Sequence, residues 1–379
     1  MDLSRLRSLP VCCTLMIRYL LAIFLAIVVL FLLATVSTPI AVGQDASPLF
    51  PVPNVTVPRS EISNLKSQVE TLTADPAHHG PGYVDHEPHW LVSIRHCRSN
   101  CRRCAQCCEL DYFSESCAAG IQRIGSSQFV SALRPGVPVC IVVHGSYVTG
   151  DTVREDSNNT FQWLRQAAPQ WPLHVVFFTW ASEGTFTIDS TNALTSPLPG
   201  VDIAILGKRA ELNGFRLAKL IHQIPSENPI CLIGHSHGAR MVASTLHLLA
   251  GGSVHDYALR PGFPQHRIRT VLAAAAIDHD WLSPDERYGE ALNATETLVS
   301  LKSRHDWALW FYPVRKPFSP KSLGRGGFTQ KDWRELGPHV PRVAEMDVTN
   351  LVGIGHIWPH YYDRPAIAHA IAPYVYFTD

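Results

Sequence analysis

The sequence lacks an excess of charge of either sign. Its 32 Lys and Arg residues balance 32 Asp and Glu residues, so the formal net charge at pH 7 is zero. A nucleic-acid-binding protein usually carries a basic excess, and we therefore expect no nucleic-acid partner. Internal repeats and charged low-complexity blocks are also missing, which argues against a repeat protein or a charged interaction tail.

Long apolar runs are scarce except at the N-terminus. A basic segment, 1–18, precedes 18 residues without a charge, 19–36, which is long enough to span a bilayer. The next basic residue is Arg59, so the charge bias leaves 1–18 in the cytoplasm and exports the rest to the periplasm or the cell exterior. We expect a membrane anchor. A small-residue site at 41–43 leaves open a cleaved signal and a secreted protein.

The segments that follow divide the chain further. Residues 37–88 read as a linker, rich in Pro, Ser and Val in its first part, with one short helix. The heptad-like spacing of that helix is too short for a coiled coil. We expect residues 89–130 to hold the first strand and a cysteine-rich segment, and residues 131–379 to form the main domain.

Cysteine is abundant and concentrated. Six of the ten cysteines lie within 21 residues, at Cys97, Cys101, Cys104, Cys107, Cys108 and Cys117. An exported segment favours disulfides, with fifteen pairings open, whereas the short spacings leave zinc or iron–sulfur ligation as the alternative. Cys140 and Cys231 stand apart in apolar runs, and we expect them to be small buried residues.

The main domain alternates between two patterns. Short apolar runs without polar alternation predict strands buried on both faces, and longer periodic segments predict helices. The expected strands are 90–94, 138–143, 174–179, 230–233, 270–277 and 297–301, and the expected helices are 159–168, 202–224, 239–249 and 365–374. This alternation predicts an α/β fold with a doubly wound, mostly parallel sheet.

One motif carries chemistry. The stretch CLIGHSHGAR, 231–240, places Ser236 in a Gly-x-Ser-x-Gly spacing between an apolar strand and a helix. Strand, sharp turn and helix are the context in which this spacing presents a nucleophilic serine. A serine hydroxyl needs a base beside it and an acid that orients the base, and in this arrangement both follow the serine along the chain.

Two acids and two bases compete for those roles. Asp306 follows a late strand, where an orienting carboxylate belongs, and we prefer it to Asp278, which follows an earlier strand. An N-cap at the next helix is the structural alternative for Asp306, and we expect one aspartate not to serve both. His356 follows a glycine-hinged loop, and we prefer it as base to His360 before the last helix.

An acyl-transfer enzyme forms a tetrahedral intermediate, and the negative oxygen of that intermediate needs hydrogen-bond donors. The backbone N–H of His237, directly after the serine, is one. The stretch HGSY, 144–147, follows an early buried strand, and we expect the second donor at Ser146 or Tyr147.

Together HGSY, FTWASEG (178–184), GHSHG (234–238), the Asp306 loop and the terminal histidine loop resemble the α/β-hydrolase superfamily, and more narrowly an uncharacterised bacterial esterase-like and lipase-like branch. The resemblance covers roughly residues 130–379. It implies an α/β-hydrolase fold and a serine hydrolase with Ser236, Asp306 and His356 or His360 as its triad. His237 and the doubled terminal histidine depart from the pattern, which leaves the identity of the base open.

The expected function is therefore cleavage of a carboxylic ester through an acyl-enzyme, with a small-molecule or lipid ester as substrate and no cofactor. The membrane is a partner through the N-terminal helix. Two alternatives remain. One is a non-catalytic hydrolase-like scaffold whose cysteine-rich segment binds a partner, and the other is a metal or redox protein centred on the cysteines.

Overall fold

The computed structural model describes residues 88–97, 109–116, 120–186, 199–259, 265–315 and 320–378. The chain divides into two compact units, Met1–Ala74 and Asp75–Asp379, and all described residues belong to the second. The predicted membrane segment 19–36, the linker helix and most of the cysteine-rich segment lie outside the described residues. Within the described ranges, no helix has the length and apolar character needed to cross a membrane.

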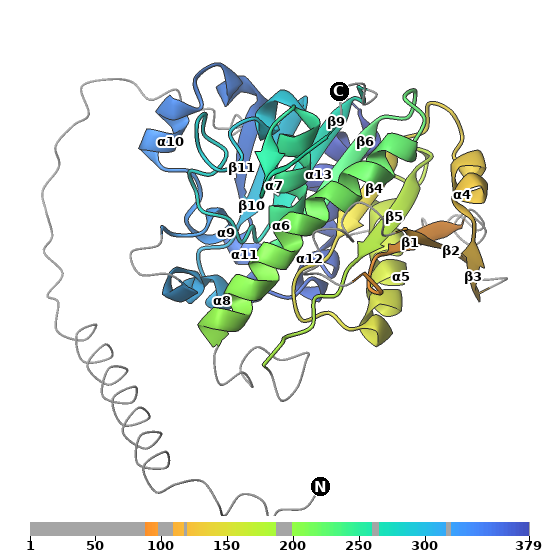
Figure 1. Ribbon diagram of the computed structural model, residues 1–379, viewed down its shortest axis with the longest axis horizontal. Helices are drawn as coiled ribbons and strands as arrows, with labels where there is room; N and C mark the ends of the chain where they lie inside the picture. The colour runs from red at the N-terminus through yellow and green to blue at the C-terminus, as the bar shows by residue number, and fades with distance from the viewer. Residues whose placement is uncertain are drawn as a thin grey trace, which may run out of the picture. The chain divides into compact units, whose positions relative to one another are not determined.

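A nine-stranded sheet forms the centre of the second unit (Figure 1). Its order is β11-β10-β9-β6-β4-β5-β1-β2-β3. The strands from β11 to β1 run parallel, and β2 and β3 join antiparallel at one edge. The strands are β1 (His89–Ser93), β2 (Asp111–Ser116), β3 (Gly120–Ile124), β4 (Val139–Val143), β5 (His174–Thr179), β6 (Ile230–His235), β9 (Ile268–Ala273), β10 (Thr297–Lys302) and β11 (Val343–Asp347), with a separate ribbon of β7 (Ser253–Val254) and β8 (Tyr257–Ala258).

Helices lie against both faces of this sheet. The α-helices are α4 (Ser126–Ala132), α5 (Gly150–Ala167), α6 (Pro199–Gln223), α7 (His237–Leu249), α8 (Trp307–Trp310), α9 (Leu323–Gly326), α10 (Gln330–Glu335), α11 (Thr349–Val352), α12 (Pro359–Tyr362) and α13 (Pro365–Tyr376), and the 3-10 turns are η3 (Ala291–Asn293), η4 (Tyr312–Arg315) and η5 (Gly337–Arg342). Figure 1 shows α6 and α7 in front of the sheet. Because both faces are covered, β4, β5 and β6 are buried along their whole length. The predicted doubly wound, mostly parallel α/β sheet is confirmed, and it is consistent with an α/β-hydrolase fold.

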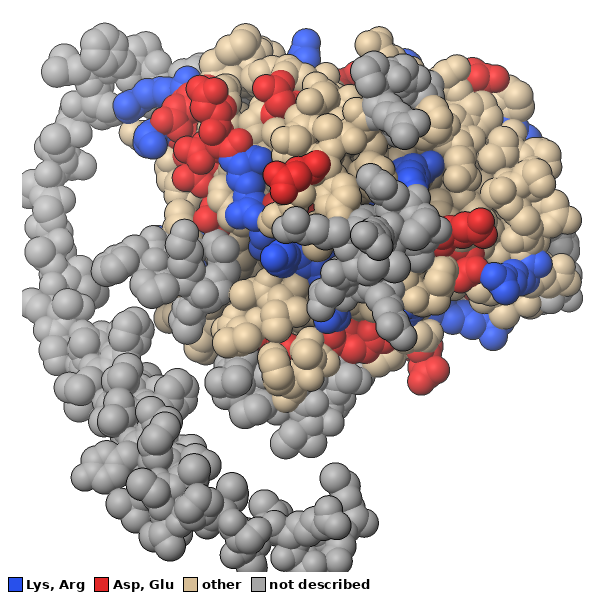
Figure 2. Space-filling model, in the orientation of Figure 1, with Lys and Arg blue, Asp and Glu red and all other residues tan. Residues whose placement is uncertain are grey.

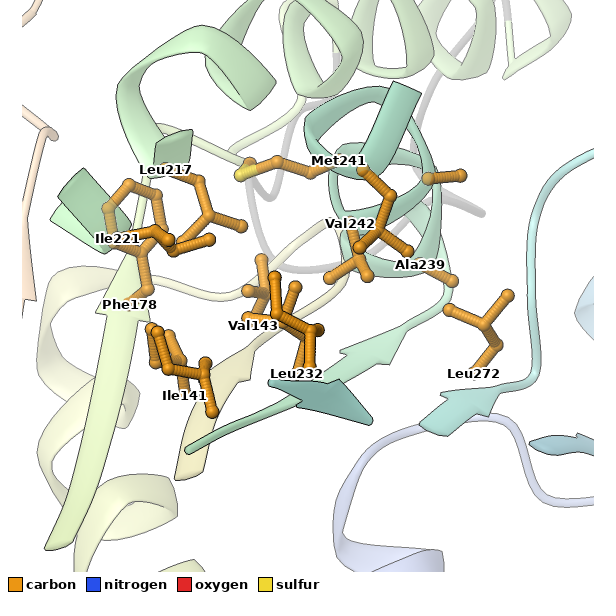
Figure 3. Close-up of a cluster of buried hydrophobic side chains, with 14 of the residues drawn as sticks. Ile141, Val143, Phe178, Leu217, Ile221, Leu232, Ala239, Met241, Val242 and Leu272 are labelled. Atoms are coloured by element: carbon orange, nitrogen blue, oxygen red, sulfur yellow. The ribbon is translucent and has the colours of Figure 1, made fainter. Parts of the chain in front are cut away.

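The core in front of the sheet joins α6 and α7 to the central strands (Figure 3). Leu217 and Ile221 of α6 and Met241 of α7 are almost fully buried, and they pack in one cluster with Ile141 of β4 and Leu232 of β6. Each such side chain contributes about 1.5–3 kcal/mol by leaving water. A second cluster on the other face unites α5 and α13. This packing fixes α7, and with it the turn that precedes it.

Two element boundaries differ from the sequence prediction by four residues or more. The expected strand 270–277 ends at Ala273, because Ala274 takes a left-handed conformation with φ of 46° and turns the chain out of the sheet. The expected helix 159–168 begins nine residues earlier, at Gly150. There Thr149 and Thr152 cap each other's backbone N–H groups, so the polar residues that hid this helix belong to its first turns.

The cysteine-rich segment is only partly described. Cys97 is buried, and the other five cysteines of the cluster lie outside the described residues, so disulfide pairing within the cluster stays a prediction. β2 and β3, which the sequence analysis did not predict, occupy part of residues 89–130 and extend the sheet. Cys140 and Cys231 are neighbours in register on β4 and β6, and both are buried free thiols as expected. Burial raises the pKa of the Cys140 thiol well above its usual value.

The parallel strands deliver the predicted site residues to one edge of the sheet. Gly145 follows β4, Ser236 follows β6 and Asp306 follows β10, while His356 comes after β11 and the short helix α11. The carboxyl ends of parallel strands meet at the same edge, where α/β proteins place their sites. Figure 2 shows acidic and basic side chains interspersed over the visible face, as the balanced composition predicts.

Candidate active site

Ser236 occupies a strained turn between β6 and α7. Its backbone has φ of 52° and ψ of −120°, a conformation that non-glycine residues rarely adopt. The flanking glycines permit the turn, since a Cβ on Gly238 would collide with the backbone oxygens of Val143 and His144. The predicted strand, sharp turn and helix are therefore all present around Ser236.

A continuous chain of hydrogen bonds joins the serine to the preferred base and acid. Ser236 Oγ lies 3.0 Å from Nε2 of His356, and His356 Nδ1 lies 2.7 Å from Oδ2 of Asp306. Because an ionised carboxylate only accepts, Nδ1–H donates to Asp306 and Nε2 accepts from the Ser236 hydroxyl. The tautomer is thus the one that a general base for this serine requires.

Asp306 is fully buried and serves two partners at once. Its Oδ1 accepts from the backbone N–H of Leu309 at 2.9 Å, which caps α8, while Oδ2 accepts from His356. The expectation that one aspartate would not do both is wrong. The two carboxylate oxygens divide the roles, and the cap holds the carboxylate rigidly toward the imidazole.

The alternative acid and base are engaged elsewhere. His360 packs against Gly355, where an added Cβ would collide with its ring, and the base position beside Ser236 is filled by His356. Oδ1 of Asp278 accepts from the hydroxyl of Tyr312 at 2.8 Å. Of the predicted pairs, the structure therefore brings together the two that were preferred.

His235 is a contact that the sequence analysis did not identify. It lies directly before the serine, and its Nε2 is 2.6 Å from the backbone carbonyl of His356, so Nε2–H donates to that oxygen. Its ring also contacts the rings of His356, Trp358 and Tyr361. Burial, reinforced by the nearby His356, holds the pKa of His235 well below its usual value. A neutral His235 thus anchors the loop that carries His356 to the turn at Ser236.

The loop after β4 reaches the same point. A Cβ on Gly145 would lie 2.9 Å from both the His235 ring and Cβ of Ser236, so only glycine permits this approach. The Ser146 hydroxyl lies 2.6 Å from Nδ1 of His237, joining the two residues proposed as oxyanion donors. The backbone N–H of Tyr147 donates to the carbonyl of Ser182 at 2.7 Å. Of the two residues expected to supply the second donor, Tyr147 is therefore excluded, because its backbone N–H already has an acceptor.

Two further motif residues hold this loop in place. His144 is fully buried, its Nδ1–H donates to the Gly145 carbonyl at 2.8 Å and its Nε2 accepts from the Thr179 hydroxyl at 2.9 Å. Burial, together with the charge of Arg95, lowers the pKa of His144 to about 3, so it stays neutral. The indole N–H of Trp180 donates to the His144 carbonyl at 3.0 Å. Thr179 and Trp180 of the FTWASEG stretch therefore hold His144 of the HGSY stretch in place.

Among the described residues, no group of three or more His, Cys, Asp or Glu side chains is arranged to hold a metal ion. The metal alternative concerns the cysteine cluster, which lies mostly outside those residues.

Comparisons with known proteins give distant structural likeness only. No family model and no curated protein matches the sequence. Esterase B from Lactobacillus rhamnosis, solved with a tributyrin phosphonate inhibitor, has 9% identity and a TM-score of 0.33, over 82% of this chain and 91% of the esterase. A lipase/esterase from Lactobacillus plantarum has 13% identity and a TM-score of 0.29, over 72% of this chain and 94% of that one. LpqC, a poly(3-hydroxybutyrate) depolymerase from Bordetella parapertussis, has 15% identity and a TM-score of 0.31, over 63% of this chain and 80% of that one.

Proposed function

We propose that this chain is a serine hydrolase that cleaves carboxylic esters through an acyl-enzyme. The observation that carries the proposal is the hydrogen-bonded chain Ser236–His356–Asp306, built on a strained turn at the carboxyl edge of a parallel sheet. Those three side chains in that order supply a nucleophile, a base and an acid that orients the base.

In the first half of the reaction, the Ser236 hydroxyl attacks the ester carbonyl carbon and His356 Nε2 takes its proton. The imidazolium that forms is stabilised by Asp306, which accepts from Nδ1–H in a buried setting. The proton then passes from Nε2 to the leaving alcohol oxygen as the carbon–oxygen bond breaks. An acyl group remains on Ser236.

In the second half, water attacks the acyl carbonyl carbon while His356 Nε2 takes one of its protons. The bond between that carbon and Ser236 Oγ then breaks, Oγ receives the proton from Nε2, and the acid product leaves. Both tetrahedral intermediates carry a negative oxygen. We assign its donors to the backbone N–H groups of His237 and Ser146, since the N–H of Tyr147 already has an acceptor. The side-chain bond between Ser146 and His237 holds the two residues together.

The decisive experiment is covalent labelling of the full chain by a fluorophosphonate, which reacts with an activated serine. We expect one label, located by peptide mapping on Ser236, and no label on Ser236→Ala. Ser131→Ala serves as the matched control, because Ser131 is exposed on α4 and its hydroxyl contacts only Gln128 in its own helix. A folded wild-type protein that takes no label would leave the non-catalytic scaffold as the better assignment.

A further inference from the structure

Exposed large hydrophobic side chains are concentrated in two short segments. Ten such side chains are exposed among the described residues, and six of them fall within residues 307–311 and 351–357. These six are Trp307, Trp310, Phe311, Leu351, Ile354 and Ile357. Single exposed apolar side chains are ordinary in soluble domains, but a cluster with two tryptophans marks an interaction surface.

The first segment directly follows the proposed acid, and the second contains the proposed base. Trp307 directly follows Asp306, whereas Ile354 and Ile357 stand on either side of His356. The backbone N–H of Trp307 donates to the Ile354 carbonyl at 3.3 Å, so the segments lie against each other. We call Trp307, Trp310, Phe311, Ile354 and Ile357 the apolar rim.

The members of the apolar rim are too exposed to serve the core. The exposed fraction is 70% for Ile354, 65% for Trp310, 56% for Ile357 and 55% for Phe311. Contact with an apolar phase would remove this surface from water, and the burial of each side chain would lower the free energy of the system. Burial of all of them requires a partner that can receive several side chains together.

Two observations favour a lipid surface as that partner. The apolar rim flanks His356, whose Nε2 lies 3.0 Å from Ser236 Oγ, so a protein docked on the rim would cover the proposed catalytic edge, whereas a lipid layer would present an ester to it. The guanidinium of Arg325 lies 5.0 Å from the ring centre of Trp310, and Arg304, three positions before Trp307 in the chain, is 68% exposed, with Asp347 as its partner at 2.9 Å. Tryptophan with neighbouring arginine suits the headgroup zone, where one end of a side chain is apolar and the other wet.

We propose that the apolar rim docks the catalytic edge of the sheet onto a lipid bilayer, and that the substrate is an acyl ester presented in that surface. This inference rests on the proposed hydrolase function for its substrate. The docking itself depends only on the exposed side chains.

The test measures hydrogen exchange of the full chain carrying Ser236→Ala, with and without vesicles of phosphatidylcholine and phosphatidylglycerol. The readout is local because residues 19–36 are themselves predicted to enter a membrane. We expect vesicles to slow exchange in peptides covering 307–311 and 351–357 and to leave peptides around the exposed Ile121 and Trp171 unchanged. Equal exchange with and without vesicles would overturn the proposal. Protection that grows with protein concentration in the absence of vesicles would overturn it in favour of a second copy of the chain.

Paired variants separate docking from catalysis. In active full-chain protein, Trp310→Ser with Phe311→Ser should lower hydrolysis of a vesicle-borne ester about tenfold or more beyond any loss on a water-soluble ester. Trp171→Ser, half-exposed before β5 and far along the chain from both segments, should change neither rate. Equal losses on both esters would contradict docking. Protection by vesicles without any hydrolysis would contradict the hydrolase proposal and leave docking intact.

Discussion

Two buried carboxylates in this protein have opposite settings, and the contrast explains why only one suits the proposed catalysis. Asp306 meets one imidazole and one backbone N–H. Glu211 of α6 instead accepts from Arg240 at 3.0 Å, from two nitrogens of Arg287 at 2.6 and 2.7 Å, from the Tyr288 hydroxyl at 2.9 Å and from His255 at 3.1 Å.

The surroundings of Glu211 lock its charge. Burial alone would raise its pKa, but the hydrogen bonds from Arg287 and the charge of Arg240 prevail and lower it to about 2. Both guanidinium groups also lie over the Trp281 ring, at 4.9 and 4.7 Å from its centre. A carboxylate whose oxygens are all hydrogen-bonded in this way links α6 to α7 and to the loop after β9. Asp306, whose main partner can gain and lose a proton, can instead respond during a reaction.

The largest effect that sharpens this contrast is expected from Asp306→Asn. Asparagine can still cap α8 through its side-chain oxygen, so the free energy of unfolding should change by less than about 1 kcal/mol. Its amide N–H₂ faces His356 Nδ1, however, and forces the wrong tautomer, so kcat on a soluble p-nitrophenyl ester should fall about 10⁴-fold. Steady-state kinetics and thermal unfolding of the same samples separate the two. Retained activity would remove Asp306 from the proposed mechanism.

Glu211→Gln should show the reverse pattern. Removing the charge leaves the buried guanidinium of Arg240 without its counter-ion, and the free energy of unfolding should fall by about 3 to 5 kcal/mol. Activity of the folded protein at low temperature should stay within about tenfold of wild type. Glu335→Gln is the matched control, because Glu335 pairs with the exposed Lys331 at 3.2 Å on the surface of α10, and we expect no measurable change in urea denaturation. An inactive but stable Glu211→Gln would break the comparison.

The pH dependence of that destabilisation is a smaller, independent test. The folded pKa of Glu211, about 2, lies below its ordinary value of 4.5. Its stabilisation is therefore complete above pH 4.5 and is lost as the pH falls toward 2. The difference in unfolding free energy between wild type and Glu211→Gln should narrow by about 3 kcal/mol over that interval. A constant difference would show that the ion cluster does not hold the carboxylate ionised.

The sequence predicted which residues hydrogen-bond to one another at Ser236, His356 and Asp306 better than it predicted the ion cluster, for a physical reason. A glycine-flanked serine between strand and helix is a local pattern, and chain order then limits where the acid and base can stand. The Glu211 partners come instead from α7, from the β7–β8 turn and from the loop after β9. Only the packing of α6 on α7 brings them together.

The local sequence pattern also left some conformations and contacts of individual residues unpredicted. Asp306 reads either as a helix cap or as a triad acid, and only the positions of its two oxygens show that it is both. Ala274 sits in an unbroken apolar run, so nothing in the pattern reveals the positive φ that ends β9 there. The sequence pattern does not reveal the hydrogen bond of His235, because its partner is a backbone carbonyl 121 positions away.

The smallest expected effect concerns the second terminal histidine. His356→Ala should leave almost no activity, because it removes the group that takes the Ser236 proton. His360→Ala removes a ring that packs against Gly355, so kcat should fall by less than about tenfold, a barrier change of about 1.4 kcal/mol. Asp278→Asn should be similarly mild, since Asp278 is held by Tyr312. Kinetics of the three variants on one soluble ester, with unfolding measured alongside, decide the matter. If His360→Ala is as inactive as His356→Ala at equal stability, the assignment of His356 alone as the base fails. His360 then also takes part in proton transfer, and the hydrogen bond from His356 no longer suffices to distinguish Asp306 from Glu211.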